Sequence, residues 1–224
     1  MIERGGKNEE RLYIYDLNFR HGRDDVCVTK TDMPNLNDII ARHRARYFLP
    51  ASFCRRDMKV LDFPCGSGYG YQILGELAAY EGLDIDDVSL EYARKIYFNS
   101  LKVFRKGNLC EPHITKNAYD IIACIEGIEH IESEFHKPLI DSFHAGLVPG
   151  GRLFVTCPES KKAVSGPSDK NPYHKHELTE KDFHSLLQSA FSNTVIFKTK
   201  DVLHNGSIQN MMYAICTKND KGGS

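Results

Sequence analysis

From residue 58 onwards, short apolar segments alternate with segments of helical periodicity, and this alternation restricts the possible folds more than any other feature. The expected strands cover residues 58–62, 81–85, 101–107, 118–125, 152–158, 194–200 and 210–218. The expected helices cover residues 35–48, 71–80, 88–98, 132–147 and 177–191, the first ended by Pro50 and the fourth by Pro-Gly-Gly at 149–151. Strands that alternate with helices predict an α/β fold, a parallel sheet with helices on both faces. Only a loop separates the last two strands, so we expect one of them to be antiparallel.

The composition predicts one packed cytoplasmic domain. A hydrophobic fraction of 41% over 224 residues is enough for one core, and no apolar run is long enough to span a membrane. The charged start MIERGGKNEE lacks the apolar stretch of a secretory signal. The seven cysteines are odd in number and contain no CxxC pair, which indicates reduced thiols. A net charge of −1 argues against general nucleic-acid affinity, which needs a surplus of Lys and Arg.

We expect three regions along the chain. Residues 1–34 form an N-terminal arm or lid, residues 35–217 form the domain, and residues 218–224 form a polar tail. Tyr13 and Tyr15 in the arm either cover an acceptor pocket or pack as ordinary core residues, and these two interpretations have equal weight.

A glycine-rich turn follows the first strand of the alternating pattern. In VLDFPCGSGYG (60–70) the strand ends at Asp62, and Gly66, Gly68 and Gly70 lead into a helix. Glycines permit positive φ angles and let the backbone approach a ligand closely, while the helix N-terminus offers free N–H groups. A turn of this kind is also common in α/β folds that bind no nucleotide, so it is weak evidence by itself.

Asp84 lies 22 residues after Asp62, at the carboxyl end of the second expected strand. An acidic residue at this place binds the ribose hydroxyls of a nucleoside that lies across the first turn. The alternative role for an aspartate here is to cap the next helix. We assign the capping role to Asp87 and the ribose role to Asp84.

Five motifs in order resemble the class I S-adenosylmethionine-dependent methyltransferases, over about residues 40–217. They are VLDFPCGSGYG, GLDIDDVSLEYAR, KGNL (106–109), AYDIIACIEGIEH and LVPGGRLFVTCPES. NPYHKHELTEKDF and ARHRARY (41–47) are similar to segments of a bacterial subgroup that acts on small molecules or glycans. The resemblance implies a Rossmann-like sheet of seven strands, mostly parallel with one antiparallel strand, and S-adenosyl-L-methionine as cofactor.

The resemblance also implies a set of cofactor-binding residues. They are Asp62, Phe63, Cys65, Gly66, Gly68, Asp84, Ile85, Asn108, Leu109, Glu126 and Arg46. Two positions depart from the family pattern: Pro64 stands where the first glycine is usual, and Asn108 replaces an acidic residue near the adenine. Proline removes an N–H and fixes φ, whereas an asparagine carbonyl still accepts a hydrogen bond from an adenine amino group.

The expected catalytic residues are Glu129 and His130, which follow the fourth strand, and His174, in the loop that follows the fifth strand. Imidazoles suit the removal of a proton from a hydroxyl at neutral pH. The E-x-x-E-H sequence Glu126 to His130 also resembles a metal motif of some small-RNA and quinone-precursor O-methyltransferases, with His174 or His176 as a further ligand for magnesium or manganese. We expect no metal here, because metal-free relatives have the same sequence.

The expected reaction is methyl transfer to an oxygen or nitrogen of a small molecule or glycan. Arg42, Arg44, Arg46, Arg55, Arg56 and Lys59 stand against Asp57 alone in residues 41–59. Most of them belong to a solvated face, but Arg46 and Tyr47 are placed to reach the cofactor's carboxylate. Three alternatives stay open: a metal-dependent small-RNA 2′-O-methyltransferase, an enzyme that cyclises or cleaves the cofactor, and a non-catalytic cofactor-binding subunit.

The acceptor is expected to be chosen by the N-terminal arm, the loop 158–176 and the region near His204. The sequence does not indicate an oligomeric state.

Overall fold

The computed structural model describes residues 36–97, 101–203 and 206–219, together with the backbone of three short strands before them. These strands are β1 (Arg11–Tyr13), β2 (Asn18–Arg20) and β3 (Cys27–Val28), which pair antiparallel in the order β1-β2-β3. The proposed lid side chains Tyr13 and Tyr15, and the acceptor region near His204, lie outside the part of the chain whose side chains are described.

Seven strands form the central sheet in the order β6-β5-β4-β7-β8-β10-β9. They are β4 (Lys59–Asp62), β5 (Ala79–Asp84), β6 (Lys102–Lys106), β7 (Tyr119–Ile125), β8 (Leu147–Pro158), β9 (Asn193–Val202) and β10 (Ile208–Thr217). Strand β10 is antiparallel to both neighbours, β8 and β9, and the other pairs are parallel. The expected α/β fold with one antiparallel strand is confirmed.

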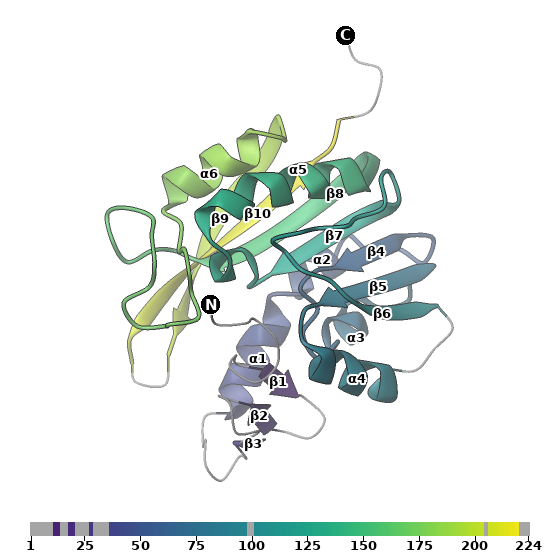
Figure 1. Cartoon of the computed structure of the whole chain (residues 1–224), viewed down its shortest axis with the longest axis horizontal. Coiled ribbons are helices and arrows are strands. Elements are labelled where there is room, and N and C mark those ends of the chain that lie inside the picture. The colour runs from purple at the N-terminus through teal and green to yellow at the C-terminus, as the bar shows by residue number, and fades with distance from the viewer. Residues whose placement is uncertain are drawn as a thin grey trace.

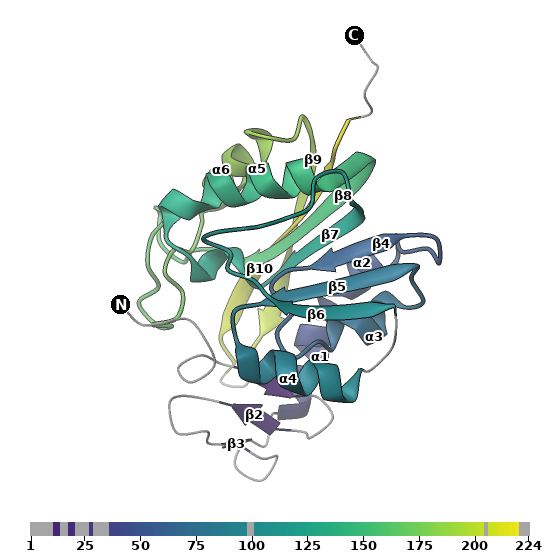
Figure 2. The same cartoon turned by 45° about the vertical axis from the view of Figure 1, so that its right-hand side comes forward.

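Helices cover both faces of this sheet, as Figures 1 and 2 show. The described helices are α1 (Leu36–Ala45), α2 (Phe48–Ala51), α3 (Gly70–Leu74), α4 (Asp87–Ile96), α5 (His136–Gly146) and α6 (Glu180–Gln188), with 3-10 turns at Ile128–His130 and Ser133–Phe135. In both views α5 and α6 lie on one side of the sheet and α1 to α4 on the other. None of the described helices is long and apolar enough to cross a bilayer.

Strand β7 divides the core into two parts, because successive side chains of a strand point to opposite faces. Ile122 and Cys124 pack with the residues of α5 and α6, whereas Ile121 and Ala123 pack with those of α3 and α4. All four side chains are fully buried. A strand buried on both faces has a nearly continuous apolar sequence, which is the pattern of AYDIIACI (118–125).

Two predicted helix ends are wrong. The helix expected over 71–80 ends at Leu74, because Gly75 has a φ of +87° and leaves the helical conformation. Ala79 and Tyr80 belong to strand β5 instead. The first helix ends at Ala45 rather than at Pro50, and Pro50 lies inside the separate short helix α2, where a first-turn proline has no hydrogen bond to lose.

The capping assignment and one strand boundary are also corrected. Asp86, not Asp87, is the N-cap of α4: its Oδ1 accepts a hydrogen bond from the N–H of Val88 at 3.1 Å, and Ser89 donates to Oδ2. The Pro-Gly-Gly run at 149–151 does not follow a helix directly but lies within strand β8, which begins at Leu147, immediately after the last residue of α5.

Candidate active site

A cavity of about 520 Å³ opens at the carboxyl ends of β4, β5 and β7. The order of the strands reverses here, since β5 and β7 lie on opposite sides of β4, and ligands of open α/β sheets bind at such a switch point. The expected site residues that line the cavity are Arg46, Phe63, Cys65, Gly66, Asp84, Ile85, Asn108, Leu109, Glu126, His130 and His174. Asp62, Gly68 and Glu129 are not among its lining residues and lie behind its wall.

The glycine turn after β4 forms the floor of the cavity. Gly66 has a φ of +54°, and a Cβ at this position would meet nothing within 4 Å, so the backbone faces open space. Gly68 has a φ of +84° and packs against Ala93 and Phe104, where a Cβ would lie 2.8 Å from each side chain. Gly66 therefore borders the ligand space, whereas Gly68 lets the turn lie close to α4 and β6.

Pro64 fits into the turn because residue 127 is a glycine. The Phe63–Pro64 peptide bond is cis, and a Cβ on Gly127 would lie 2.4 Å from the Cδ of Pro64. Both residues line the cavity. The departure from the usual glycine at position 64 is thus accommodated by contact with the segment that follows β7.

Asp84 is held at the end of β5 by two backbone donors. Its Oδ2 accepts from the N–H of Gly66 at 2.8 Å, and its Oδ1 accepts from the N–H of Asp86 at 2.9 Å. Asp84 is therefore fixed against the glycine turn with its carboxylate at the cavity, the position that the ribose role requires.

Asp62 belongs to a buried network of tyrosines. Its carboxylate accepts hydrogen bonds from the hydroxyl of Tyr47 at 3.1 Å and from that of Tyr80 at 2.7 Å. Complete burial raises the pKa of Asp62 to about 7, although both hydrogen bonds favour its charged form. Asp62 and the Tyr47 hydroxyl therefore fasten α1 and α2 to the sheet, and Tyr47 also lines the cavity.

Arg46 reaches the cavity from the end of α1. Its Nη2 lies 3.0 Å from Asp201 Oδ2 and 3.5 Å from Glu126 Oε2, and the residue is 6% exposed. Nε and Nη1 are buried and have no hydrogen-bond partner. Burial lowers the pKa of Arg46, but the charges of Glu126 and Asp201 outweigh burial and raise it. A buried guanidinium with two unsatisfied donors requires an acceptor group beside it.

Asn108, Ile85 and Leu109 line the same part of the cavity, beyond the end of β5. The side-chain oxygen of Asn108 accepts a hydrogen bond from the N–H of Cys110 at 3.0 Å and so stabilises its own turn. The apolar side chains of Ile85 and Leu109 suit a flat aromatic ring, and a carbonyl oxygen has a second lone pair for an amino group.

Glu126 has an unusual backbone conformation at the end of β7. Its φ is +52°, a value that residues with a Cβ rarely adopt and that is concentrated at functional sites. The N–H of Glu126 donates to the carbonyl of Thr156, and its carboxylate faces Arg46 across the cavity wall. The surrounding contacts thus hold an acidic side chain at the centre of the site.

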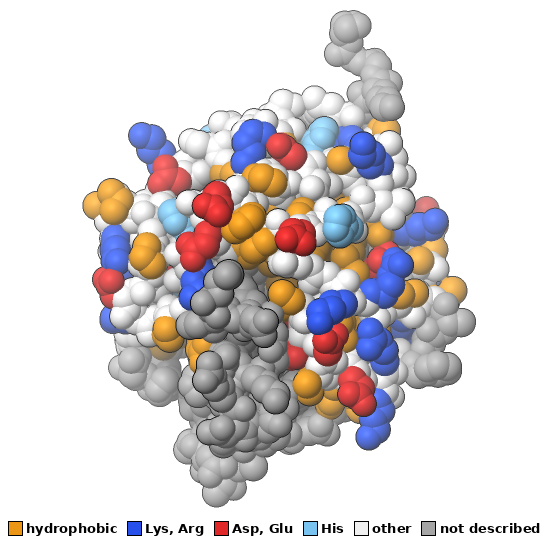
Figure 3. Space-filling view, in the orientation of Figure 1, with side chains coloured by type: hydrophobic (Ala, Val, Ile, Leu, Met, Phe, Trp, Pro, Cys, Tyr) orange, Lys and Arg blue, Asp and Glu red, His pale blue; other side chains and the backbone are white. Residues whose placement is uncertain are grey.

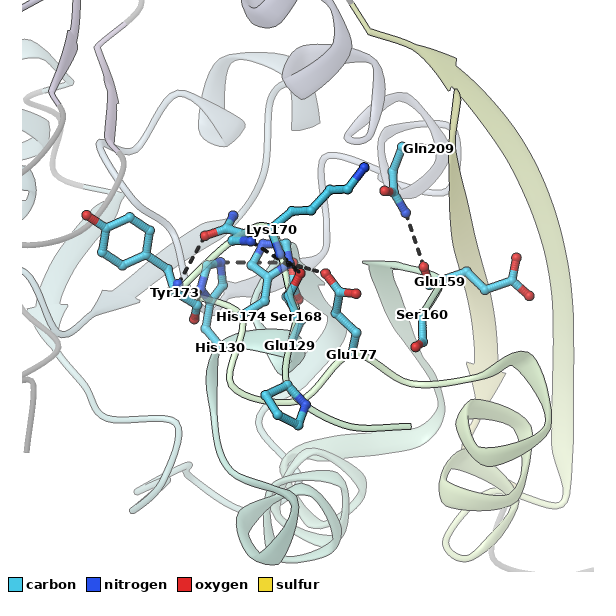
Figure 4. A network of polar contacts seen from close by, with 12 residues as sticks. Glu129, His130, Glu159, Ser160, Ser168, Lys170, Tyr173, His174, Glu177 and Gln209 are labelled. Carbon is cyan, nitrogen blue, oxygen red and sulfur yellow. Dashed lines mark hydrogen bonds and ion pairs between the residues drawn. The ribbon is translucent and has the colours of Figure 1, made fainter. Parts of the chain in front are cut away.

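His130, His174 and Glu129 come together, as Figure 4 shows. The two imidazole rings are 5.0 Å apart in an edge-to-face arrangement, and His130 Nε2 lies 4.0 Å from Glu129 Oε1. Nδ1 of His130 donates to the carbonyl of Tyr173 at 3.1 Å, and Nδ1 of His174 lies 2.7 Å from Glu177 Oε1. The three predicted catalytic residues therefore form one cluster. The contact of His130 with Tyr173, which precedes His174, joins parts of the chain that are 43 residues apart.

The charges of this cluster depend on burial. Glu129 is 1% exposed, neither of its carboxylate oxygens has a hydrogen-bond partner, and burial together with the charge of Glu126 raises its pKa. Burial lowers the pKa of His174, but the hydrogen bond to Glu177 and the charges of Glu129, Glu177 and Glu126 together outweigh burial, and the pKa is raised. These residues can hold and exchange a proton, or they can surround a cation.

Two further candidates take structural roles. The ring of His176 faces the ring of His136 at 5.3 Å, and the backbone N–H of His176 donates to the carbonyl of Glu129. It is therefore His174 and not His176 that joins the cluster. Tyr173 contributes its carbonyl to His130, which fits the interpretation that it anchors its loop. In the basic stretch, Arg55 and Arg56 make exposed ion pairs with Asp57 and Glu76, as expected of a solvated face.

The cavity also contains residues that the sequence did not indicate. Three lysines from the loop after β8 line it, and these are Lys161, Lys162 and Lys170. His43 of α1 and Asp201 of β9 line it as well. Burial and the nearby charge of Arg46 lower the pKa of His43, which keeps its imidazole neutral. The motifs named above do not contain the three lysines or Asp201, whereas His43 lies within ARHRARY (41–47). Only the pairing of β9 with β10 brings Asp201 to the site.

The fold and the site define a class of protein. A seven-stranded sheet with this order, a glycine turn after the first strand of its parallel half and a buried acidic residue after the second are features of a Rossmann-like, nucleoside-binding methyltransferase. The profile of the methyltransferase domain family matches residues 35–193, and the chain belongs to this family.

Similar proteins agree with this membership. A "Probable S-adenosylmethionine-dependent methyltransferase" of Mycolicibacterium smegmatis is 30% identical over 152 residues, which is 66% of this chain and 57% of the relative. The chain thus spans little more than half of that relative's length. The YcgJ protein of Bacillus subtilis has a TM-score of 0.63 at 13% identity, covering 80% of this chain and 100% of its own. A Haemonchus contortus phosphoethanolamine N-methyltransferase has the same TM-score and identity, covering 82% of this chain and 53% of its own.

S-adenosyl-L-methionine is the cofactor of this family, and the cavity fits it on three observations. Gly66 leaves open space beside the turn, Asp84 holds a carboxylate at the cavity, and Arg46 has two unsatisfied buried donors. These features match a polar amino-acid end and a ribose. The expected cofactor and enzyme class are therefore confirmed by the family, while the individual contacts remain predictions.

Proposed function

We propose that the chain transfers a methyl group from S-adenosyl-L-methionine to an oxygen or nitrogen of a small molecule or glycan. The observation that carries this proposal is the division of one cavity into two differently lined parts. Asp84, Ile85 and Leu109 line the part next to the glycine turn, whereas His130 and His174 line the part next to the loop after β8. One part suits a nucleoside and the other a polar acceptor.

Within this proposal, each cofactor-facing residue has a stated task. Asp84 binds the ribose hydroxyls, Ile85 and Leu109 enclose the adenine ring, and Asn108 accepts from its amino group. The turn at Phe63, Cys65 and Gly66 borders the methionine part, and Arg46 binds its carboxylate through the donors that have no partner among the described residues. Asp62 and Gly68 support the turn from behind, since neither lines the cavity.

The donor supplies an activated methyl group, so the chain has to align the acceptor and remove its proton. His130 and His174 are positioned for the second task, because hydrogen bonds to Tyr173 and Glu177 fix the orientation of both rings. Glu129 lies behind the cavity wall, and its charge favours the protonated form of His174.

The polar part of the cavity favours an acceptor that is small and has an anionic or oxygen-rich group. Lys161, Lys162 and Lys170 line this part, and Lys162 is paired with Asp169. On the face seen in Figure 3, basic and acidic side chains are interspersed, which is not the continuous basic surface that binds a long nucleic acid. The lysines therefore act locally, inside a cavity of limited volume.

The test begins with calorimetry of S-adenosylmethionine and its demethylated product, followed by incubation with labelled donor and a panel of sugars, phosphorylated amines and hydroxylated aromatic acids. Label in an acceptor at oxygen or nitrogen supports the proposal. Turnover of the donor without an acceptor indicates a cyclising or cleaving enzyme. Label found only in a short RNA indicates an RNA methyltransferase, and binding without any turnover indicates a non-catalytic subunit.

A further inference from the structure

Glu129, His130 and His174 place three metal-ligating side chains at one point of the cavity wall. One ligand atom of each residue lies within 4.8 Å of the others, and among the described residues no other group of three His, Cys, Asp or Glu side chains is arranged in this way. Ligands of one ion at about 2.1 Å are at most about 4.2 Å apart. A pair at the 4.8 Å limit therefore has to close by at least about 0.6 Å when an ion binds, and by more where the two ligands are not on opposite sides of the ion.

Glu129 provides an independent reason to expect a cation. Its carboxylate is buried, and neither oxygen has a hydrogen-bond partner. An unpartnered buried carboxylate costs several kcal/mol unless a proton or a cation neutralises it. His130 lies next to these oxygens, at 4.0 Å, and both histidines line the cavity, so a cation held here would be accessible from the cavity.

The hydrogen bonds of the two histidines have the arrangement that is usual around protein metal sites. Metal-bound imidazoles generally donate their other ring N–H to a carbonyl or carboxylate, which fixes the tautomer and the orientation of the ring. Nδ1 of His130 donates to the carbonyl of Tyr173, and Nδ1 of His174 pairs with the Glu177 carboxylate. In both histidines Nε2 is then the ring nitrogen that bears the lone pair.

We propose that Glu129, His130 and His174 bind one divalent transition-metal ion, with open coordination positions that face the cavity. Two imidazoles and a carboxylate favour manganese, iron, cobalt or zinc over magnesium, which prefers oxygen ligands alone. Glu126 lies three residues before Glu129 in the chain, lines the cavity and influences the charge of Glu129, so it offers a further carboxylate near the ion. This differs from our expectation from the sequence, which was that the motif holds no metal.

The open positions would receive an acceptor oxygen, and this part of the inference rests on the proposed methyl transfer. A bound divalent ion lowers the pKa of an oxygen ligand and makes it a better nucleophile at neutral pH. The ion site itself does not depend on the donor or on any reaction, so it can be tested without either.

The test uses the full chain, freed of metal with a chelator and titrated by calorimetry with manganese, cobalt, zinc and magnesium chlorides without cofactor. We expect one equivalent of a transition-metal ion to bind at least ~10-fold more tightly than magnesium. His130→Ala, His174→Ala and Glu129→Gln should each weaken binding by ~10-fold or more, and Glu177→Gln by about as much through the orientation of His174. Cobalt should give a visible absorption band that both histidine variants lose.

His184→Ala is the matched control, because His184 is an exposed histidine on α6 outside the cavity. It should bind the ion as the parent chain does. Affinity for the demethylated cofactor product reports that each variant is folded. Absence of transition-metal binding by the folded parent chain overturns the proposal, and so does binding that survives in the His130→Ala/His174→Ala double variant. Methyl transfer that fails while the ion still binds would contradict only the proposed function.

Discussion

Arg46 and Asp201 form an ion pair of 3.0 Å between helix α1 and edge strand β9, 155 residues apart in the sequence. This pair joins the segment before the sheet to its last hairpin across the cavity. It also leaves two donors of Arg46 without a partner at the place where the cofactor's carboxylate is proposed to bind.

Arg46→Lys should weaken the binding of S-adenosylmethionine by ~10-fold or more. Lysine keeps the positive charge but lacks the planar set of donors that binds a carboxylate in two places. Calorimetry checks this loss, with 5′-methylthioadenosine as a second ligand that has no carboxylate and whose affinity should not change. Arg44→Lys, an exchange at an exposed position of the same helix, is the control. Equal losses for both ligands would contradict a contact between Arg46 and the carboxylate.

Asp84→Ala should weaken cofactor binding by about 1–3 kcal/mol, which corresponds to ~5- to 150-fold in Kd. The variant removes the proposed acceptor of the ribose hydroxyls and also the bond that holds the N–H of Gly66. The control is Asp87→Asn, because Asp87 makes an exposed ion pair with Lys106 and does not line the cavity. The 2′,3′-dideoxy analogue of S-adenosylmethionine separates the loss of the ribose contact from the loss of the bond to Gly66, because it has no ribose hydroxyls for Asp84 to bind. Its affinity should be equally low for the parent chain and for an Asp84→Asn variant.

Asp62 gives the fold a pH dependence that its asparagine variant should lack. Burial raises the pKa of Asp62 in the folded state to about 7, from its ordinary value of 3.8. Because the folded pKa is the higher one, the contribution of Asp62 to stability is complete below about pH 4 and declines as the pH rises to about 7. Urea unfolding of both chains at pH 5, 6, 7 and 8 should show the parent losing stability relative to Asp62→Asn up to pH 7. A constant difference would show that Asp62 is ionised throughout.

The positions of the strands were predictable wherever local patterns decide them. Apolar segments such as 118–125 are buried on both faces, and such segments form strands in almost any parallel sheet. The end of α3 was not predictable from propensity, because LGELAAY (74–80) has residues that favour helices. Tyr80 instead continues strand β5, where its hydroxyl reaches Asp62. Gly75, with a φ of +87°, ends the helix, and the hydrogen bond from Tyr80 to Asp62 stabilises the strand that follows.

The site residues at the ends of strands were predictable from the sequence, whereas those from the long loop and from the edge strand were not. Asp84, Glu126 and His130 follow strand ends, and the carboxyl ends of parallel strands meet at one edge of the sheet. Glu177 and Asp201 come from a long loop and from the edge strand, whose sequences have no periodic pattern that points to the cavity. Their contribution follows from how distant segments pack, which local sequence does not specify.

Gly127→Ala should lower both the stability and the cofactor affinity, because the added methyl group would overlap the ring of Pro64. The φ of Gly127 is −129°, which alanine adopts without strain, so the whole effect comes from the 2.4 Å approach of its Cβ to the Cδ of Pro64. Such overpacking costs about 1–3 kcal/mol, or roughly 2–12 °C in Tm for a chain of this size. Thermal unfolding with and without S-adenosylmethionine measures both effects. Gly166→Ala is the control, since a Cβ there meets nothing within 4 Å. A Gly127→Ala chain with unchanged Tm and affinity would show that Pro64 is free to move, and that the cofactor turn does not depend on this contact.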